Sequence, residues 1–262
     1  DSALVTGATG HVGSALVRRL STEGVRITAL VRKGSPGRSA LPSGPRISAV
    51  EIDSSDPRAL RESLGSISPG VVFNLASAGV NPADRDPLAM LDGNVRLLVA
   101  LLGALENKKP RRFIHTGSCS EYASAETGHR IPEDYPLEPS SLYGAAKLCA
   151  SLYGAAFAAE RNMPFLNLRL FGVFGIGEAP YRVVPYLIAK LRENQPVDLT
   201  AGDQIRDWLY IDDVVDALLE AATCPHLPES GVFNVCSGHG IRLRQLAEAD
   251  VATRQRPQKE PL

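Results

Sequence analysis

Short runs of apolar, β-prone residues alternate, through residue 170, with stretches in which apolar residues recur at helical spacing. The runs predict strands near residues 3–5, 25–31, 47–50, 71–75, 113–115 and 164–168, and the intervening stretches predict helices near 12–20, 57–64, 88–105 and 143–159. Strands joined by helices of this length form βαβ units, which require a parallel sheet with helices on both faces. The pattern predicts a doubly wound α/β fold.

The pattern changes after residue 170, where glycines and prolines interrupt the apolar periodicity. The remaining signals predict helices near 184–192 and 212–222 and short strands near 197–199 and 232–235. We therefore expect a first domain over residues 1–170 and a smaller, less regular lobe over 171–262, whose segments may interleave.

A glycine-rich loop connects the first predicted strand to the first predicted helix. Gly7 permits a tight turn, Gly10 lets backbone N–H groups approach a pyrophosphate, and Gly13 lets the helix pack close to the strand. A glycine turn without a ligand is the alternative, but three glycines weaken a helix start for no structural return. The context favours a dinucleotide site on a Rossmann sheet. The loop residues assigned to the cofactor are Gly7, Thr9, Gly10, His11, Val12 and Gly13.

The residues after the second and third strands bear on the choice of cofactor. Sites that prefer NAD usually place an acidic residue on the ribose 2′-hydroxyl, whereas this chain has Arg32 and Lys33, which can pair with a 2′-phosphate. We therefore favour NADP(H) and keep NAD(H) open; a solvated basic loop is the alternative. Asp53 and Ser54 follow the third strand and are placed to meet the adenine, although Asp53 could equally cap a helix.

Tyr143 and Lys147 lie four residues apart, so they share one face of the predicted helix. An ammonium near a phenol favours the phenolate and would lower the phenol pKa from about 10, which suits proton transfer. An exposed ion-pair spacing without chemistry is the alternative. Upstream, Ser118 follows a strand at the carboxyl edge of the sheet, where open α/β folds bind ligands.

Together these residues resemble the extended short-chain dehydrogenases/reductases, which include nucleotide-sugar epimerases, dehydratases and reductases. The matching pieces, which cover nearly the whole chain, are the glycine loop, Asn74-Leu75-Ala76, Asn94, Ser118, Tyr143, Lys147, Arg169, Arg206-Asp207-Trp208 and Ile211-Asp212-Asp213. The resemblance implies that Tyr143 is the acid/base, that Lys147 holds the nicotinamide ribose, and that Ser118 hydrogen-bonds the reacting oxygen.

The resemblance also implies further contacts. Those assigned to the cofactor are Leu75, Ala76, Ser77 and Asn94, and those assigned to the substrate are Ser118, Ser120, Gly172 and Arg206. Arg206 would meet the diphosphate of a nucleoside-diphosphate sugar, a role that suits a guanidinium; an ion pair with Asp203 or Asp207 is the alternative.

Departures from the family pattern narrow the reaction. Dehydratases of this group usually carry an Asp-Glu pair after the Ser or Thr, where this chain has Cys119 and Ser120, and the neighbouring Glu121 is expected to face away. An epimerase would suit tightly held NAD, whereas a reductase draws on exchangeable NADPH. We therefore favour NADPH-dependent reduction of a nucleoside-diphosphate 4-keto-6-deoxy sugar in deoxysugar biosynthesis. A nucleotide-sugar epimerase and a non-catalytic NADP(H)-binding sensor are the alternatives.

Composition excludes several other classes. The 28 Lys and Arg residues against 29 Asp and Glu give a formal charge of -1, without the excess that nucleic-acid binding requires. No uninterrupted apolar run approaches the roughly 20 residues of a membrane span, and the first residues lack a signal-peptide layout. The four cysteines and five histidines show no metal-ligand spacing. We expect a soluble cytoplasmic protein with reduced cysteines and no metal.

The predicted helices at 88–105 and 143–159 are apolar around much of their circumference. In proteins that this chain resembles, the equivalent helices form the four-helix bundle of a homodimer; burial within one subunit is the alternative. The same proteins continue beyond the strand at 232–235 with more chain than is found here. We therefore expect a substrate lobe that is short or incomplete, with Arg256 as a substitute phosphate contact.

Overall fold

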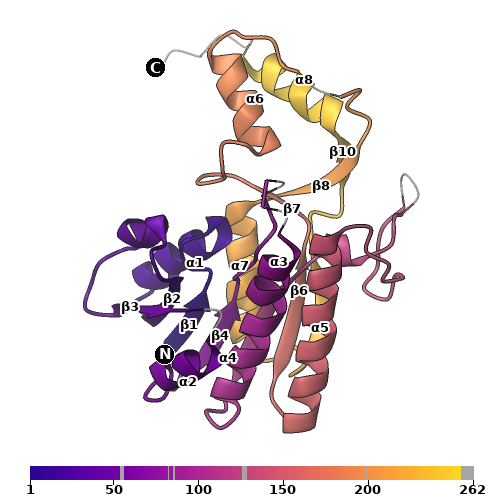
Figure 1. Cartoon of the computed structure of the whole chain (residues 1–262). Helices are drawn as coiled ribbons and strands as arrows, with labels where there is room; N and C mark the ends of the chain where they lie inside the picture. Colours follow the sequence, from indigo (N-terminus) through magenta and orange to yellow (C-terminus); the bar gives the residue numbers. More distant parts are fainter. Residues whose placement is uncertain (54–55, 82, 85, 126–128, 199, 255–262) are drawn as a thin grey trace.

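The computed structural model describes residues 1–262 except 54–55, 82, 85, 126–128, 199 and 255–262. Its centre is a seven-stranded parallel sheet in the order β3-β2-β1-β4-β5-β6-β9 (Figure 1). The strands are β1 (Ser2–Thr6), β2 (Arg26–Arg32), β3 (Ile47–Ile52), β4 (Val71–Asn74), β5 (Arg112–Ser118), β6 (Phe165–Leu170) and β9 (Gly231–Val235). This order reverses beside β1, as in the Rossmann fold, so the predicted doubly wound sheet is confirmed.

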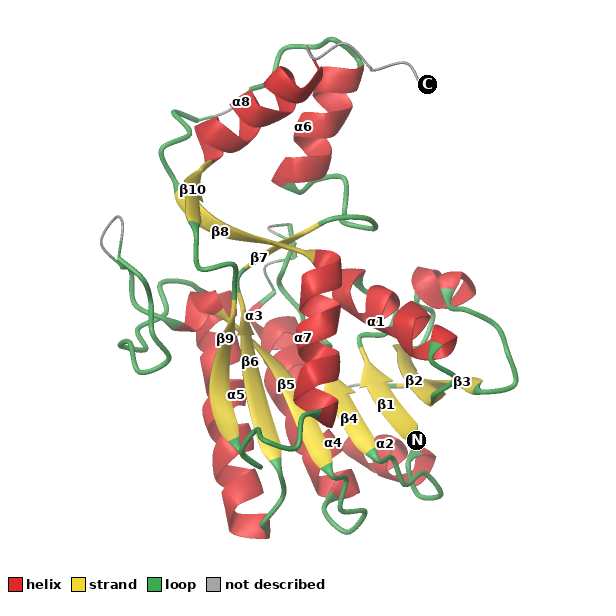
Figure 2. Cartoon of the chain, turned by 180° about the vertical axis from the view of Figure 1, so that it is seen from behind, coloured by secondary structure: helices red, strands yellow, loops and turns green. Residues whose placement is uncertain are grey.

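Two layers of helices cover the sheet (Figure 2). One face packs against α1 (His11–Thr22) and α7 (Ile211–Thr223), the other against α2 (Pro57–Ser63), α4 (Leu97–Leu105) and α5 (Leu142–Arg161). Successive side chains of β1 point to opposite faces: Ala3 and Val5 join the first cluster, and Leu4 joins the second. The central strands are therefore rich in apolar residues on both faces, because both faces are buried.

The helix predicted at 88–105 is interrupted. The structure has α3 (Pro87–Leu91), a π-helical turn η2 (Asp92–Arg96) and then α4, and the wider turn buries Asn94. By length and composition, Pro87–Leu105 is also apolar enough to cross a membrane. Leu98, Leu101 and Leu102 of α4 are fully buried against the sheet and α5, as in the core helix of a folded domain.

The smaller lobe stands at the carboxyl end of the large sheet (Figure 1). It consists of a second sheet, β10-β8-β7, with β7 (Gly172–Phe174), β8 (Ile205–Tyr210) and β10 (Gly240–Arg242), together with α6 (Val183–Arg192) and α8 (Leu243–Arg254). Helix α7 and strand β9 return from this lobe to the large sheet. After residue 170 the chain therefore passes repeatedly between the smaller lobe and the large sheet.

The secondary structure of this lobe differs from the prediction in several elements. Residues 196–198 have no regular structure, and the rest of the strand predicted there lies outside the described residues. Strands β7, β8 and β10 and helix α8 were not predicted. Charged residues interrupt β8, whose side chains are mostly half-buried, so it lacks the apolar signal of the central strands.

Candidate active site

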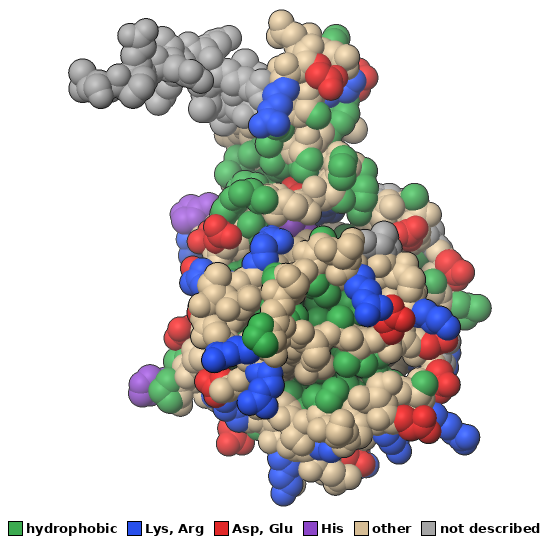
Figure 3. Space-filling view, turned by 90° about the vertical axis from the view of Figure 1, so that its left-hand side faces the viewer, with side chains coloured by type: hydrophobic (Ala, Val, Ile, Leu, Met, Phe, Trp, Pro, Cys, Tyr) green, Lys and Arg blue, Asp and Glu red, His purple; other side chains and the backbone are tan. Residues whose placement is uncertain are grey.

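A cavity of about 630 Å³ opens where the carboxyl ends of the central strands face the smaller lobe. Its walls combine the glycine loop, the loop after β5, the start of α5 and the strand β8, which lie far apart in the sequence. Figure 3 shows the smaller lobe standing off from the larger body, with hydrophobic side chains gathered where the two meet. This is the edge at which open α/β sheets bind ligands.

The glycine loop is shaped by close backbone packing. Gly7 has φ +63°, and a Cβ there would lie 2.7 Å from the backbone of Leu75 and Ala76. A Cβ on Gly13 would lie 2.1 Å from the Gly7 carbonyl oxygen, so α1 can approach β1 only with glycine at that position. The α1 N-cap, Gly10, supplies no side chain to the first N–H groups of the helix. These donors and the helix dipole suit a pyrophosphate.

The residues assigned to the adenosine end lie outside the cavity walls. Arg32 and Lys33 are exposed at the end of β2 and form no ion pair within the described part of the chain. Thr9 is covered by the short helix η1 (Pro36–Ala40), because its Oγ1 lies 3.3 Å from Ser35 Oγ. Asp53 follows β3 and is exposed.

The alternative role for Asp53 as a helix cap is wrong. Helix α2 is capped by Asp56, whose carboxylate accepts the Arg58 N–H at 2.9 Å and the Ala59 N–H at 3.1 Å. The prediction for Ser54 lies outside the described residues.

Hydrogen bonds with Thr6 and Asn94 hold the loop after β4 in place. Thr6 Oγ1 accepts the Ala76 N–H at 3.1 Å, which leaves Leu75 and Ser77, but not Ala76, in the cavity wall. Asn94 does not line the cavity. Its Oδ1 accepts from Ser77 Oγ at 3.1 Å and its Nδ2 donates to the Ala78 carbonyl at 3.0 Å. The structure therefore places Asn94 where it orients the loop, rather than at the cavity surface.

Ser118, Tyr143 and Lys147 meet in the cavity wall. Ser118 ends β5, and α5 begins at its N-cap Ser141, whose Oγ accepts the Gly144 N–H at 3.1 Å. This start places Tyr143 in the first turn, where its phenol hydrogen-bonds with Ser77 and Ser118. A Cβ on Gly144 would lie 2.2 Å from the Ser120 carbonyl oxygen, so glycine lets α5 pack against the loop that carries Ser118.

The pKa values of Tyr143 and Lys147 are set mainly by burial. Removal from water lowers the pKa of Lys147 to about 8, although the negative charge of Glu121 acts in the opposite direction. Burial also raises the pKa of Tyr143 above its ordinary value, despite the hydrogen bonds with Ser77 and Ser118. The expected lowering of the phenol pKa is therefore wrong for this structure. A protonated phenol is the form that can donate a proton.

The other residues assigned to the substrate also line the cavity. Ser120, Gly172 and Arg206 all line the cavity, and Arg206 donates only to its neighbouring Ile205 carbonyl, at 2.8 Å, among the described residues. The acidic residues that could have paired with Arg206 have other partners: Asp203 lies 3.2 Å from Arg244 Nη2, and Asp207 accepts the Ser237 N–H at 2.7 Å. The guanidinium thus remains available at the cavity.

Sequence reasoning missed part of this wall. Glu178 and Arg182 line the cavity and form an ion pair at 3.2 Å, and the Glu178 side chain is only 3% exposed. Burial raises the pKa of the Glu178 carboxyl. In the sequence, Gly175 and Gly177 were the indication of a turn before these residues. Their positive φ angles turn the chain back toward His11, but the sequence alone does not show where this turn leads. Among the described residues, no cluster of His, Cys, Asp or Glu could hold a metal ion.

Comparison with known proteins gives the family of the chain and its similar relatives. Residues 3–236 match the model of the NAD dependent epimerase/dehydratase family. The chain is 27% identical over 278 residues to the putative UDP-arabinose 4-epimerase 4 of Arabidopsis thaliana, covering 94% of this chain and 63% of that protein. It is 29% identical over 251 residues to the dTDP-6-deoxy-L-talose 4-dehydrogenase (NAD(P)(+)) of Kitasatospora kifunensis, covering 93% and 76%.

A solved structure agrees with these relatives. MoeE5 in complex with UDP-glucuronic acid and NAD has a TM-score of 0.84 and 30% identity, covering 97% of this chain and 82% of that chain. The chain spans less than two thirds of the length of the Arabidopsis relative and about three quarters of the Kitasatospora relative.

Proposed function

Since the chain belongs to the NAD dependent epimerase/dehydratase family, we propose that it reduces the ketone of a nucleoside-diphosphate 4-keto-6-deoxy sugar with NADPH. The observation that carries this proposal is that the glycine loop shares one cavity with Ser118 and Tyr143. A dinucleotide site and a protonated phenol are thereby brought together, and a carbonyl reduction needs both.

The glycine loop suits a dinucleotide because no side chain caps the first N–H groups of α1, which can therefore bind a pyrophosphate. A reduced nicotinamide, when bound, would supply the hydride. Tyr143 donates its phenolic proton to the ketone oxygen, Ser118 holds that oxygen by a hydrogen bond, and Lys147, in the same cavity wall, would hold the nicotinamide ribose. Orientation and charge stabilisation by these groups would supply most of the rate.

The substrate proposal draws on both the cavity and the relatives. MoeE5 carries UDP-glucuronic acid, and both curated relatives are named for nucleotide sugars. Arg206 is available to bind a diphosphate. Dehydration is disfavoured because Cys119 and Ser120 stand beside Ser118 in the cavity wall, without a carboxylate, whereas the Glu121 side chain is fully buried outside that wall.

Tyr143→Phe tests the catalytic assignment. It removes only the phenolic hydroxyl, so we expect kcat to fall by about 10²-fold or more while cofactor affinity stays within about twofold. The measurements are steady-state turnover and fluorescence titration with NADPH, and Tyr153→Phe on the exposed side of the same helix is the control. Full activity in Tyr143→Phe would falsify the assignment.

Epimerisation is the second candidate, favoured by the Arabidopsis relative and by the NAD in the MoeE5 structure. The two candidates differ in whether reduced cofactor is consumed. We would measure nicotinamide absorbance with NADPH and NADH against a panel of nucleoside-diphosphate 4-keto-6-deoxy sugars, with products identified by NMR. Stoichiometric loss of NADPH supports the reductase. Interconversion of hydroxyl epimers without net consumption supports the epimerase.

We also propose that the protein acts as a cytoplasmic homodimer. The exposed large apolar residues of α3 and α5 suit a four-helix interface: Leu88, Leu91, Leu142, Leu152 and Tyr153. Figure 1 places these two helices on the same side of the sheet.

A further inference from the structure

Glu121 is a charged residue that the proposed chemistry leaves unexplained. It ends the short helix η3 (Cys119–Glu121), its side chain is fully buried, and it does not line the cavity. One carboxylate oxygen accepts the Ser118 N–H at 2.8 Å and the Ser151 hydroxyl at 3.0 Å. The other accepts from Arg169 Nε at 2.9 Å. A buried carboxylate with this many donors is held in one orientation.

The surrounding backbone is shaped around this carboxylate. A Cβ on Gly117 would lie 2.5 Å from Glu121 Oε1, so any larger residue would displace it. Ser118 and Glu121 also form a reciprocal capping pair: Ser118 Oγ accepts the Ser120 N–H at 3.1 Å while Glu121 accepts the Ser118 N–H. Glu121 therefore fixes the backbone of the residue whose hydroxyl faces the reacting oxygen.

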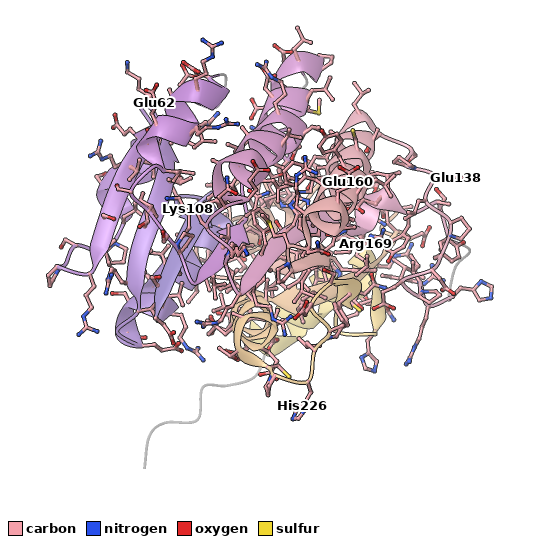
Figure 4. The ribbon with its side chains drawn as sticks, turned by 90° about the horizontal axis from the view of Figure 1, so that it is seen from below. Glu62, Lys108, Glu138, Glu160, Arg169 and His226 are labelled. Atoms are coloured by element: carbon pink, nitrogen blue, oxygen red, sulfur yellow. The ribbon has the colours of Figure 1, made fainter. Side chains whose placement is uncertain are left out.

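Arg169, which donates to the Glu121 carboxylate, is itself held by further hydrogen bonds. Its Nη1 donates to the Tyr122 hydroxyl at 2.8 Å and to the Glu133 carbonyl at 3.1 Å, and its side chain is 4% exposed. Figure 4 shows Arg169 among packed side chains in the interior, whereas Glu62 and His226 lie at the outside.

Glu121 is the negative charge that balances two buried positive charges, those of Lys147 and Arg169. Lys147 is 1% exposed and Arg169 is also buried, so two cations share the interior with one anion. The other titratable groups around them are Tyr143 on α5, His115 on β5, Cys119 on η3 and Tyr122 after η3, whose pKa burial raises, so that its phenol is neutral. Burial and the charge of Lys147 hold the pKa of His115 well below its usual range, so His115 is neutral. Burial likewise raises the pKa values of Tyr143 and Cys119, and both stay neutral.

We propose that Glu121 is a positioning residue for the reaction proposed above. Its carboxylate fixes Ser118 through the backbone, and its negative charge, held against α5 by Ser151 one turn beyond Lys147, keeps the Lys147 ammonium protonated. This inference rests on the proposed function, because a charged Lys147 matters to turnover only where Tyr143 transfers a proton. A buried ammonium that loses its anion releases its proton at lower pH.

Glu121→Gln is the test, since the amide keeps an acceptor oxygen and the side-chain volume but removes the charge. We would follow Lys147 by NMR of 13Cε-labelled lysine, assigned by loss of its signal in Lys147→Arg, and record kcat against pH. In Glu121→Gln we expect the Lys147 titration to move down by about one unit or more, and the alkaline limb of kcat to move with it. Ser151→Ala removes one hydrogen bond from the same carboxylate without changing its charge, so it should leave the Lys147 titration in place.

Glu121→Gln leaves the buried Arg169 without its ion-pair partner, and this variant could fail to fold. A second pair of variants tests the inference in that case. Arg169→Gln frees Glu121 from its cation, so the Lys147 titration should rise, and adding Glu121→Gln to it should lower the titration again. An unchanged Lys147 titration across these variants overturns the inference. If the titration moves as expected while the wild-type protein turns over no nucleotide sugar, the proposed function fails and the electrostatic role of Glu121 stands.

Discussion

The Lys147 ammonium is buried, and burial favours the neutral amine. Its pKa is about 8 in the folded protein and near 10.5 when the chain is unfolded, so the unfolded state binds the proton more tightly. The resulting penalty is complete below pH 8 and disappears as the pH rises from 8 to 10.5. A residue retained at such a cost is typical of a functional site.

Lys147→Met should therefore separate stability from activity. The thioether side chain is unbranched like that of lysine, one atom shorter and uncharged, so the free energy of unfolding at pH 7 should rise by about 3 kcal/mol, while turnover is lost. Urea unfolding at pH 7 and at pH 10 measures the effect, and the gain should fall to about 1 kcal/mol at the higher pH, where the lysine of the unfolded chain is only partly protonated. A variant less stable than the wild type at pH 7 would contradict this account.

Arg32 and Lys33 are the residues on which the proposed preference for NADP(H) rests. If they pair with a 2′-phosphate, replacing both with Gln should raise the KM for NADPH about tenfold or more and leave the KM for NADH almost unchanged. Arg26→Gln is the matched control, because Arg26 is exposed at the opposite end of β2. Equal KM values for NADPH before and after the double replacement would remove the support for NADP(H).

Among the elements, α5 and η3 are in the closest contact at the site. Gly144→Ala would place a methyl group 2.2 Å from the Ser120 carbonyl oxygen, so α5 must shift and carry Tyr143 away from Ser118. We expect kcat to fall by about 10-fold or more, since misplacement of catalytic groups is costly. Gly103→Ala in α4 is the control: a Cβ there meets only Arg61 Nη2, at 3.6 Å, and alanine favours the helix.

The elements that the sequence predicts are those with a periodic apolar pattern. Helices α1 and α5 and the central strands pack against a buried face, so their apolar residues recur at the period of the element. The π-helical turn at Asp92–Arg96 was not predictable, because one widened turn leaves the surrounding apolar spacing helical. Strand β8 was missed because it belongs to a small, half-exposed sheet and carries Arg206 and Asp207.

Part of the site was likewise predicted from the sequence and part was not. The convergence of Ser118, Tyr143 and Lys147 follows from strand order, because the carboxyl ends of parallel strands meet at one edge. Glu178 and Arg182 were missed because their position depends on a turn that only the folded chain defines. The pKa of Tyr143 was mispredicted because spacing reveals the neighbouring ammonium but not the loss of water around the phenol.

At the scale of the whole molecule, the exposed apolar residues of α3 and α5 predict self-association. Leu152 is 56% exposed and Leu88 is 72% exposed, so Leu152→Glu combined with Leu88→Glu should convert a dimer into a monomer. Sedimentation equilibrium measures the mass, and Ile241→Glu, an exposed apolar position in the smaller lobe, is the control. A wild-type protein that stays monomeric at about 10 μM would contradict the proposed interface.

The seventh strand of the large sheet also bears on how the protein is made. Strand β6 pairs with β9, yet β9 begins only at Gly231, after the chain has built most of the smaller lobe. During synthesis, at about 5–20 residues per second, the outer edge of β6 therefore waits several seconds for its partner. An unpaired strand edge is a template for pairing with other chains. Between residues 170 and 231 a nascent chain therefore carries an open strand edge at which another chain, or a chaperone, can bind.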